Sequence, residues 1–238
     1  VGSLSDVMVQ TPHGPILIGG DSSELGSANI DFMKKVKLIK GINAIEADCV
    51  LLDLGGDTSY NILDFFLQAD HGIVVTTRDS AAYIGAYHFL KAAIYRKLNR
   101  LTGMEARSGK DLKDAALERY IHQATMSDTG SKTINELVAA VRNDRPEYLA
   151  AIMKAVWEFN PCLVVNRVPH GVRPEEVAGK IQAVAKKWLA RDVRLLGSIG
   201  RHIDVERSAV DLVPAITRNP AGAFAGEIAA IGNKLVTG

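Results

Sequence analysis

Short apolar runs of strand length alternate with helical patterns along most of this chain. The runs lie near residues 15–19, 49–53, 72–77, 162–166 and 193–199. Such a rhythm is typical of right-handed βαβ crossovers, which build a parallel sheet with helices on its faces. The sequence therefore predicts an α/β fold with a mostly parallel sheet flanked by helices.

The rhythm stops between residues 96 and 160, where only helical patterns occur. A stretch of that length is too long for an unstructured loop in a compact domain. We interpret it as a helical insertion, free of strands, within a single α/β domain that spans residues 1–238.

Composition places the chain among ordinary globular proteins. Its 238 residues are 47% hydrophobic and 23% charged, and the formal net charge is +1. That balance gives no global attraction to nucleic acid or membrane, and no apolar run is long enough to cross a bilayer. Cys49 and Cys162 both fall in predicted strands, so we expect two buried free thiols and a reducing, cytoplasmic location.

The stretch that follows the second apolar run carries the clearest chemistry. Asp53 ends the predicted strand, Gly55 and Gly56 allow a tight turn, and Thr58 or Ser59 can cap the next helix. Open α/β sheets bind ligands at the carboxyl ends of their strands, where a glycine turn attracts phosphate and an aspartate can hold magnesium. A plain strand–turn–helix, with Asp53 only as a turn former, explains the local pattern equally well.

Four motifs follow one another in a recognisable order. They are Asp-Leu-Gly-Gly at 53–56, Ala-Asp-His-Gly-Ile-Val-Val-Thr-Thr at 69–77, Leu-Val-Val-Asn-Arg-Val at 163–168 and Leu-Leu-Gly-Ser-Ile at 195–199. Their order and spacing resemble the MinD/ParA/FlhG group of deviant-Walker P-loop ATPases. The resemblance covers residues 48–95 and 161–236 well, and residues 1–47 more loosely.

On the phosphate side, the resemblance implies roles for four residues. Asp53 matches the Walker B aspartate, which makes it the expected catalytic and magnesium-organising residue. Gly55 and Gly56 match the switch II turn beside the γ-phosphate, and Asp57 stands where the family has a glycine that donates a backbone N–H to phosphate.

On the base side, the resemblance implies roles for three more residues. Asn166 matches the asparagine that recognises adenine, and Arg167 lies beside it. The loop that begins at Gly200 matches one that lines the base pocket. The implied function is a nucleotide-switch ATPase, a hydrolase that binds ATP and Mg²⁺, forms a nucleotide-dependent homodimer and regulates positioning or partitioning.

Three departures limit that expectation. The family's phosphate loop, Lys-Gly-Gly-x-Gly-Lys-Thr/Ser, does not occur in the sequence; Asp57 replaces the switch II glycine; and Arg78-Asp79 replaces a Pro-Glu pair. We therefore expect an N-terminally truncated P-loop NTPase fold, a fragment that is inactive alone and binds ATP weakly or not at all. A scaffold that kept the fold and lost hydrolysis is the alternative, and an unrelated flavodoxin-like domain is a third.

In the family, the phosphate-loop strand lies between the strands that correspond here to 49–53 and 72–77. Without it, these two strands either stay apart, leaving unpaired edges and an apolar groove, or close together and pair.

Residues 91–113 carry a local excess of basic residues. This stretch is a candidate contact for DNA or anionic membrane, although a solvated helix face is the interpretation that we prefer.

Overall fold

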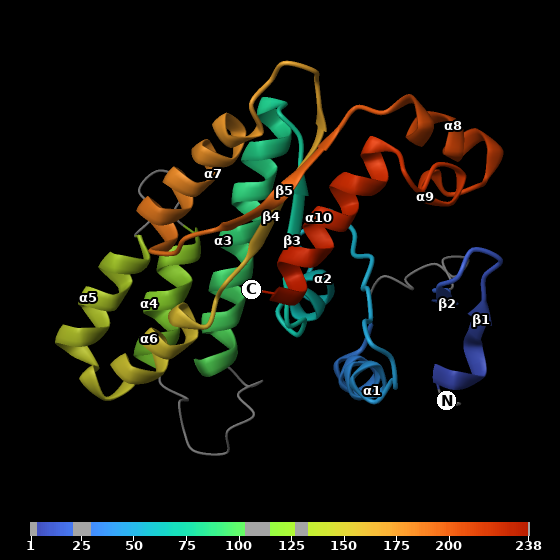
Figure 1. The fold of residues 1–238 in the computed structure, drawn as a ribbon. Coiled ribbons are helices and arrows are strands. Elements are labelled where there is room, and N and C mark those ends of the chain that lie inside the picture. Colours follow the sequence, from blue (N-terminus) through green and yellow to red (C-terminus); the bar gives the residue numbers. More distant parts are fainter. Residues whose placement is uncertain (1–3, 21–29, 103–114, 127–132, 238) are drawn as a thin grey trace.

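A parallel sheet of three strands lies at the centre of the protein (Figure 1). The computed structural model describes residues 4–20, 30–102, 115–126 and 133–237. The strands run in the order β3 (Ile73–Thr76), β4 (Cys162–Val168) and β5 (Arg194–Gly200), and each pairs in parallel with its neighbour. The predicted α/β fold with a parallel sheet flanked by helices is therefore confirmed, although the sheet is smaller than predicted.

The central strand β4 is apolar along most of its length because both of its faces are covered. Successive side chains of a strand point to opposite faces. Leu163 and Val165 accordingly belong to the larger core, whereas Cys162 and Val164 pack in a smaller core with Leu196 of the neighbouring strand and Ile231 of the helix that covers this face. Burial on both faces accounts for a continuous apolar run in place of an alternating one.

Helices cover the two faces of this sheet separately (Figure 1). α3 (Ser80–Thr102) and α7 (Pro174–Leu189) pack together on the side of the larger core, and α10 (Ala223–Thr237) packs on β5 from the other side. Gly197 allows the close approach of α10, because a Cβ at this position would lie 2.9 Å from the side chain of Ile231.

The helical excursion between residues 96 and 160 is present as predicted. After α3 it contains α4 (Ala115–Met126), α5 (Ile134–Asp144), the 3₁₀ turn η2 (Pro146–Tyr148) and α6 (Leu149–Trp157), and its described residues form no strand. The start of α5 is a capping box, in which the Thr133 hydroxyl accepts from the Glu136 N–H and the Glu136 carboxylate accepts from the Thr133 N–H. Its status as an insertion within one domain stays a prediction.

The predicted strand at 15–19 does not belong to the parallel sheet, so that part of the prediction is wrong. After η1 (Leu4–Val7), β1 (Met8–Gln10) and β2 (Ile16–Ile18) form a separate antiparallel hairpin. The intervening turn brings the Thr11 N–H to the Pro15 carbonyl oxygen at 3.2 Å, with Gly14 in a positive-φ conformation. Because of this local turn, the apolar run pairs with β1 and not with a strand of the parallel sheet. The next helix is α1 (Phe32–Asn43).

The predicted strand at 49–53 does not form either. Residues 49–55 have no regular secondary structure, Leu51 is 85% exposed, and the Cys49 thiol is exposed where we expected it to be buried; Cys162 is buried as expected. An apolar run becomes a strand only if another strand satisfies its backbone, and among the described residues β3 pairs only with β4. Of the two arrangements considered above, the segment 49–53 and β3 therefore stay apart.

The remaining helices are α2 (Tyr60–Phe66), α8 (Ile203–Asp211) and α9 (Ala215–Arg218). Every helix in the described part of the chain is too short or too polar to span a bilayer.

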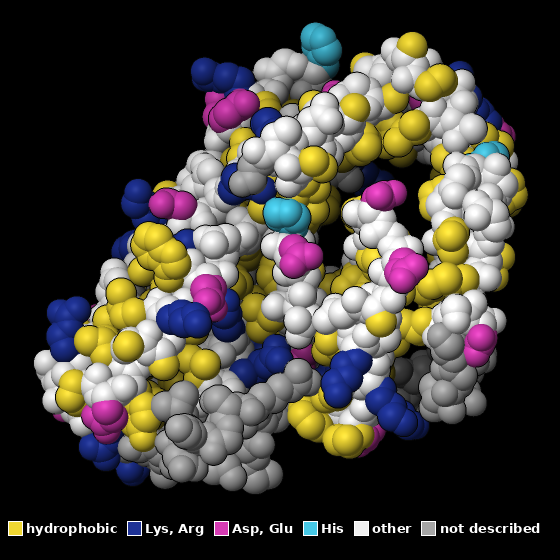
Figure 2. All heavy atoms as spheres, turned by 60° about the horizontal axis from the view of Figure 1, so that its bottom comes forward, with side chains coloured by type: hydrophobic (Ala, Val, Ile, Leu, Met, Phe, Trp, Pro, Cys, Tyr) yellow, Lys and Arg dark blue, Asp and Glu magenta, His cyan; other side chains and the backbone are white. Residues whose placement is uncertain are grey.

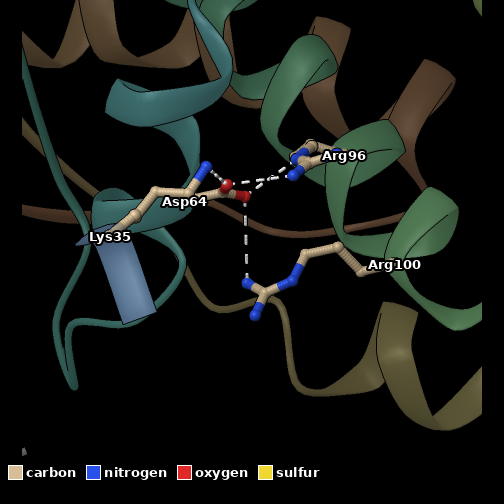
Figure 3. Close-up of polar contacts among 4 residues, drawn as sticks. All are labelled: Lys35, Asp64, Arg96 and Arg100. Carbon is tan, nitrogen blue, oxygen red and sulfur yellow. Dashed lines mark hydrogen bonds and ion pairs between the residues drawn. The ribbon is translucent and has the colours of Figure 1, made fainter. Parts of the chain in front are cut away.

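Helices α1, α2 and α3 meet at one buried carboxylate (Figure 3). Asp64 of α2 accepts from Lys35 Nζ at 2.5 Å, from Arg96 Nε at 2.8 Å and from Arg96 Nη2 at 2.9 Å. Arg100 Nη1 approaches Asp64 Oδ1 at 4.0 Å, and the Arg96 guanidinium lies 4.4 Å from the ring centroid of Tyr60. The side chains of Lys35, Asp64 and Arg96 are 5–8% exposed, so this ion cluster replaces most of the solvation that burial removes.

Opposing effects set the ionisation of Asp64. Burial raises its pKa, but the hydrogen bonds and positive charges of Arg96 and Lys35 outweigh burial, so the pKa of Asp64 lies below its usual value. The carboxylate is therefore charged at neutral pH and holds helices from distant parts of the sequence together.

Replacing Asp64 by Asn should destabilise the protein by about 3–5 kcal/mol, because it leaves buried cations without their counter-charge. Urea unfolding followed by circular dichroism measures the change. Glu158→Gln is the control: it removes a half-exposed partner of Lys97 and should cost less than about 1 kcal/mol. Equal costs for the two variants would contradict the role of the cluster.

The stability advantage over Asp64→Asn should also depend on pH. Because the folded-state pKa of Asp64 is lowered, its contribution is complete above the unfolded pKa of about 4 and is lost as the pH falls through the folded value. Unfolding both proteins in urea from pH 7 downward should show the gap shrinking only in the acid range. A stability gap that at the lowest accessible pH still equals its value at pH 7 would contradict this.

Candidate functional site

The carboxyl ends of the three parallel strands form one edge of the sheet. The register pairs Thr76, the last residue of β3, with Val165, which directly precedes Asn166, and pairs the last residues of β4 and β5, Val168 and Gly200. The Arg201 N–H extends this edge by donating to the Val168 carbonyl oxygen at 3.1 Å. Open α/β sheets bind their ligands outside this edge.

A β-bulge at the end of β4 is the most unusual feature of that edge. The pairing of β4 with β5 shifts between Val165 and Val168, and between them Arg167 adopts a left-handed conformation with φ 53°. A side chain in that region costs roughly 1–2 kcal/mol of backbone strain. Bulges re-aim side chains next to active sites, and strained residues gather at functional sites.

The bulge presents two hydrogen-bond donors at the edge. Asn166 Oδ1 accepts from the Arg167 N–H at 2.8 Å. This hydrogen bond orients the side-chain amide of Asn166. Among the residues that the structure describes, neither this NH₂ group nor the Arg167 guanidinium has a partner. The site therefore offers an amide donor and a positive charge side by side.

The loop after β5 is held by a carboxylate of α10. Glu227 Oε2 accepts from the Gly200 N–H at 2.9 Å and lies 2.8 Å from His202 Nε2. A Cβ at Gly200 would lie 3.1 Å from His202 Nε2 and 3.3 Å from Glu227 Oε1, so this close packing favours glycine. Sequence reasoning missed Glu227; the available signal is that it is the only acidic residue of α10.

The loop after β3 caps the following helix. Thr77 Oγ1 donates to Asp79 Oδ2 at 2.8 Å, and the Asp79 N–H donates to Thr77 Oγ1 at 3.3 Å. The Asp79 carbonyl oxygen accepts from the Tyr83 N–H at 3.1 Å, in the first turn of α3. Asp79 thus has a structural role at the start of α3.

The four residues predicted on the phosphate side are all exposed. Asp57 Oδ1 accepts from the Ser59 N–H at 2.7 Å, and the hydrogen bonds from the Ser59 hydroxyl and backbone lower the pKa of Asp57. The Asp53 carboxylate makes no hydrogen bond or ion pair with any described residue. Asp57 therefore stabilises the turn before α2, whereas the Asp53 carboxylate has no partner among the described residues.

Gly55 and Gly56 are glycines that the observed fold does not require. Both lie outside the positive-φ region, a Cβ at Gly56 would meet nothing within 4 Å, and one at Gly55 would have its closest contact at 3.7 Å. This turn is open to the close approach of another group.

The structure therefore brings Asn166, Arg167 and Gly200 to one edge through the pairing of β4 with β5. A crevice that they share with Asp53 and Gly55 stays a prediction, because no recorded contact joins the two groups in the described part of the chain. Within that part, no group of three or more His, Cys, Asp or Glu side chains is arranged to hold a metal ion. Magnesium at Asp53 thus stays a prediction.

An open depression lies at the amino ends of the three parallel strands, opposite the edge that carries the bulge. It has a volume of about 460 Å³ and is lined by residues that include His71, Asn160 and Arg191. Arg191 Nε donates to the Phe159 carbonyl oxygen at 3.0 Å, and its guanidinium also bonds Asn160. Because Arg191 is engaged in holding the chain, we assign this depression a structural role.

Sequence comparisons add no functional assignment to these residues. No protein-family model matches the chain, and no curated protein is significantly similar to it in sequence.

Gly200→Ala and Gly56→Ala form a matched pair. Gly200→Ala should destabilise the protein by about 1 kcal/mol, because the new methyl group displaces His202 or Glu227. Gly56→Ala should leave stability unchanged or raise it by roughly 0.4–1 kcal/mol, because the site is open and the unfolded chain loses freedom. Urea unfolding measures both, and the reverse order would contradict the packing described for Gly200.

Proposed function

We propose that this chain carries the base-recognising half of a MinD/ParA-like nucleotide site, and belongs to a P-loop nucleotide-switch ATPase. In this proposal Asn166 and Arg167 contact the adenine end of ATP, and the loop from Gly200 borders the base. Asp53 orders Mg²⁺, and the turn at Gly55 and Gly56 faces the γ-phosphate. The phosphate-binding loop motif itself does not occur within residues 1–238.

The β4 bulge is the observation that carries the proposal. A strained Arg167 and an Asn166 NH₂ without a described partner lie where ligands bind in parallel α/β sheets. An amide side chain can donate to an adenine ring nitrogen and accept from its amino group. A guanidinium can stack on the base or approach a phosphate.

The open edge of β3 supports the proposed place of the phosphate half. The Gly72 carbonyl oxygen accepts from the Cys162 N–H at 2.8 Å, so the backbone groups of Gly72 point toward β4. In a parallel strand this direction alternates from one residue to the next, so the backbone groups of Ile73 and Val75 point away from β4. Val75 is 59% exposed, and Leu51 is exposed as well. Figure 2 shows an opening on the forward face with hydrophobic side chains along part of its rim. An additional strand at β3 would carry a phosphate-binding loop to the edge that holds the bulge.

In the proposed function, catalysis consists mainly of positioning. A lysine from the phosphate loop would neutralise the triphosphate, Asp53 would organise the magnesium shell, and water would attack the γ-phosphate. The output would be a cytoplasmic homodimer whose formation depends on bound nucleotide. The chain alone, lacking the loop, would be inactive.

A non-hydrolysing scaffold with the same fold is the second candidate. The observation that favours it is the Asp57–Ser59 hydrogen bond, which engages a backbone N–H at the start of α2. The Ser59 N–H is then not available to donate to a phosphate, and the negative charge of the Asp57 carboxylate would repel a phosphate at this place.

The base half can be tested on this chain directly, by NMR titration with adenosine and, separately, guanosine. Adenosine should shift the backbone amides of Asn166, Arg167 and Gly200 at millimolar concentration, and guanosine should shift them much less. Asn166→Ala should remove the adenosine response. Asn160→Ala, which alters an asparagine at the opposite end of the same strand, should preserve it.

The proposal fails if adenosine and guanosine act alike, if the responding amides lie elsewhere, or if Asn166→Ala responds as the unaltered chain does.

A further inference from the structure

Positive charge is concentrated in three neighbouring helices. α1 and α3 together contain eight Lys or Arg residues and no Asp or Glu, and α2 contributes only Asp64. These helices therefore carry a formal charge of +7 in a chain whose net charge is +1. Such an asymmetry creates a local attraction for anionic partners that the overall composition conceals.

Helix α1 separates its charges between two faces. Lys35 and Ile39 are buried against the protein, whereas Lys34, Lys37 and Lys40 are exposed. The spacing of three residues aligns the exposed lysines along the outward side. No described residue forms an ion pair with any of them.

An exposed hydrophobic side chain accompanies these lysines. Met33, in the first turn of the helix, is 64% exposed. On a helical wheel, Met33 falls between Lys37 and Lys40. Figure 2 shows Lys and Arg side chains beside hydrophobic atoms on the forward part of the molecule, which corresponds to the bottom of Figure 1, where α1 lies.

The buried ion cluster fixes this helix in place. The Lys35–Asp64 ion pair ties α1 to α2, and the partly exposed Arg100 extends the basic region toward α3. The inward side of α1 is thus held by Lys35 and the buried Ile39, so that the exposed lysines face away from the protein.

We propose that the outward face of α1, formed by Met33, Lys34, Lys37 and Lys40, docks onto an anionic lipid bilayer. Lysines reach lipid phosphates while the hydrophobic Met33 enters the headgroup boundary. A nucleic-acid backbone offers charge but no apolar layer for Met33, so the composition of the face favours the bilayer. This interaction is independent of the nucleotide site.

Vesicle flotation with the full chain tests the proposal. The chain should float with phosphatidylcholine vesicles that contain phosphatidylglycerol and not with phosphatidylcholine vesicles alone. The triple variant Lys34→Gln, Lys37→Gln, Lys40→Gln should reduce partitioning about 100-fold, because each lysine near an anionic surface contributes roughly fivefold. Met33→Ser, which changes no charge, should also reduce it.

The matched control is Lys154→Gln, Lys186→Gln, Lys187→Gln, which removes the same charge from exposed positions on α6 and α7. It should retain binding, and circular dichroism should show every variant folded. Absence of flotation by the unaltered chain would overturn the proposal, as would equal loss in the control. Binding to a DNA duplex that depends on the three α1 lysines but not on Met33 would identify a nucleic-acid surface instead.

Discussion

The Asp64 carboxylate is the interaction on which the arrangement of the helices depends. A charge buried to this extent is tolerated only if its partners replace the lost water, and Arg96 and Lys35 do so with three hydrogen bonds. Because these partners come from α1 and α3, one side chain fixes three helices. The exposed turn at Gly55 and Gly56 precedes α2, and the basic face belongs to α1, so both proposed interaction regions are positioned by the same cluster.

The parallel ladder supplies the second constraint. β4 pairs on both sides and is buried on both faces, so it cannot move without disturbing the whole sheet. The bulge at Asn166 and Arg167 therefore lies on the most rigid strand, and Glu227 holds the neighbouring loop after β5. The edge to which we assign base recognition in the proposed function is therefore preorganised. By contrast, among the described residues β3 has a strand partner on one side only.

The parts of the fold that the sequence predicted are those with local causes. The run from Cys162 to Val165 forms a strand because burial on both faces demands continuous apolar residues. The run at 49–53 failed because a strand also requires a partner, which its composition cannot reveal. The run at 15–19 does form a strand, but it pairs with β1 in a local antiparallel hairpin.

The candidate site divides in the same way. Asn166 and Gly200 could be placed together because parallel pairing follows from the βα rhythm, whereas nothing observed joins Asp53 to them. Contacts between distant residues were missed: Asp64 bonds residues 29 and 32 positions away, and Glu227 bonds Gly200 across 27 positions. Of the basic stretch predicted at 91–113, residues 103–113 lie outside the described part of the chain, so its role as a contact stays a prediction; a second group of exposed lysines lies on α1.

The most direct measurement of the central claim is the ratio of the affinities of this chain for Mg-ATP and for adenosine, obtained by calorimetric titration. If the chain carries the base half of the site without the phosphate half, the two ligands should bind weakly and within about tenfold of each other. Each charge-assisted phosphate contact that a complete site makes is worth about 1.5–3 kcal/mol, so several such contacts would separate the affinities by orders of magnitude. Micromolar binding of Mg-ATP with measurable hydrolysis would show that the phosphate site is built from residues of this chain, and would contradict the account.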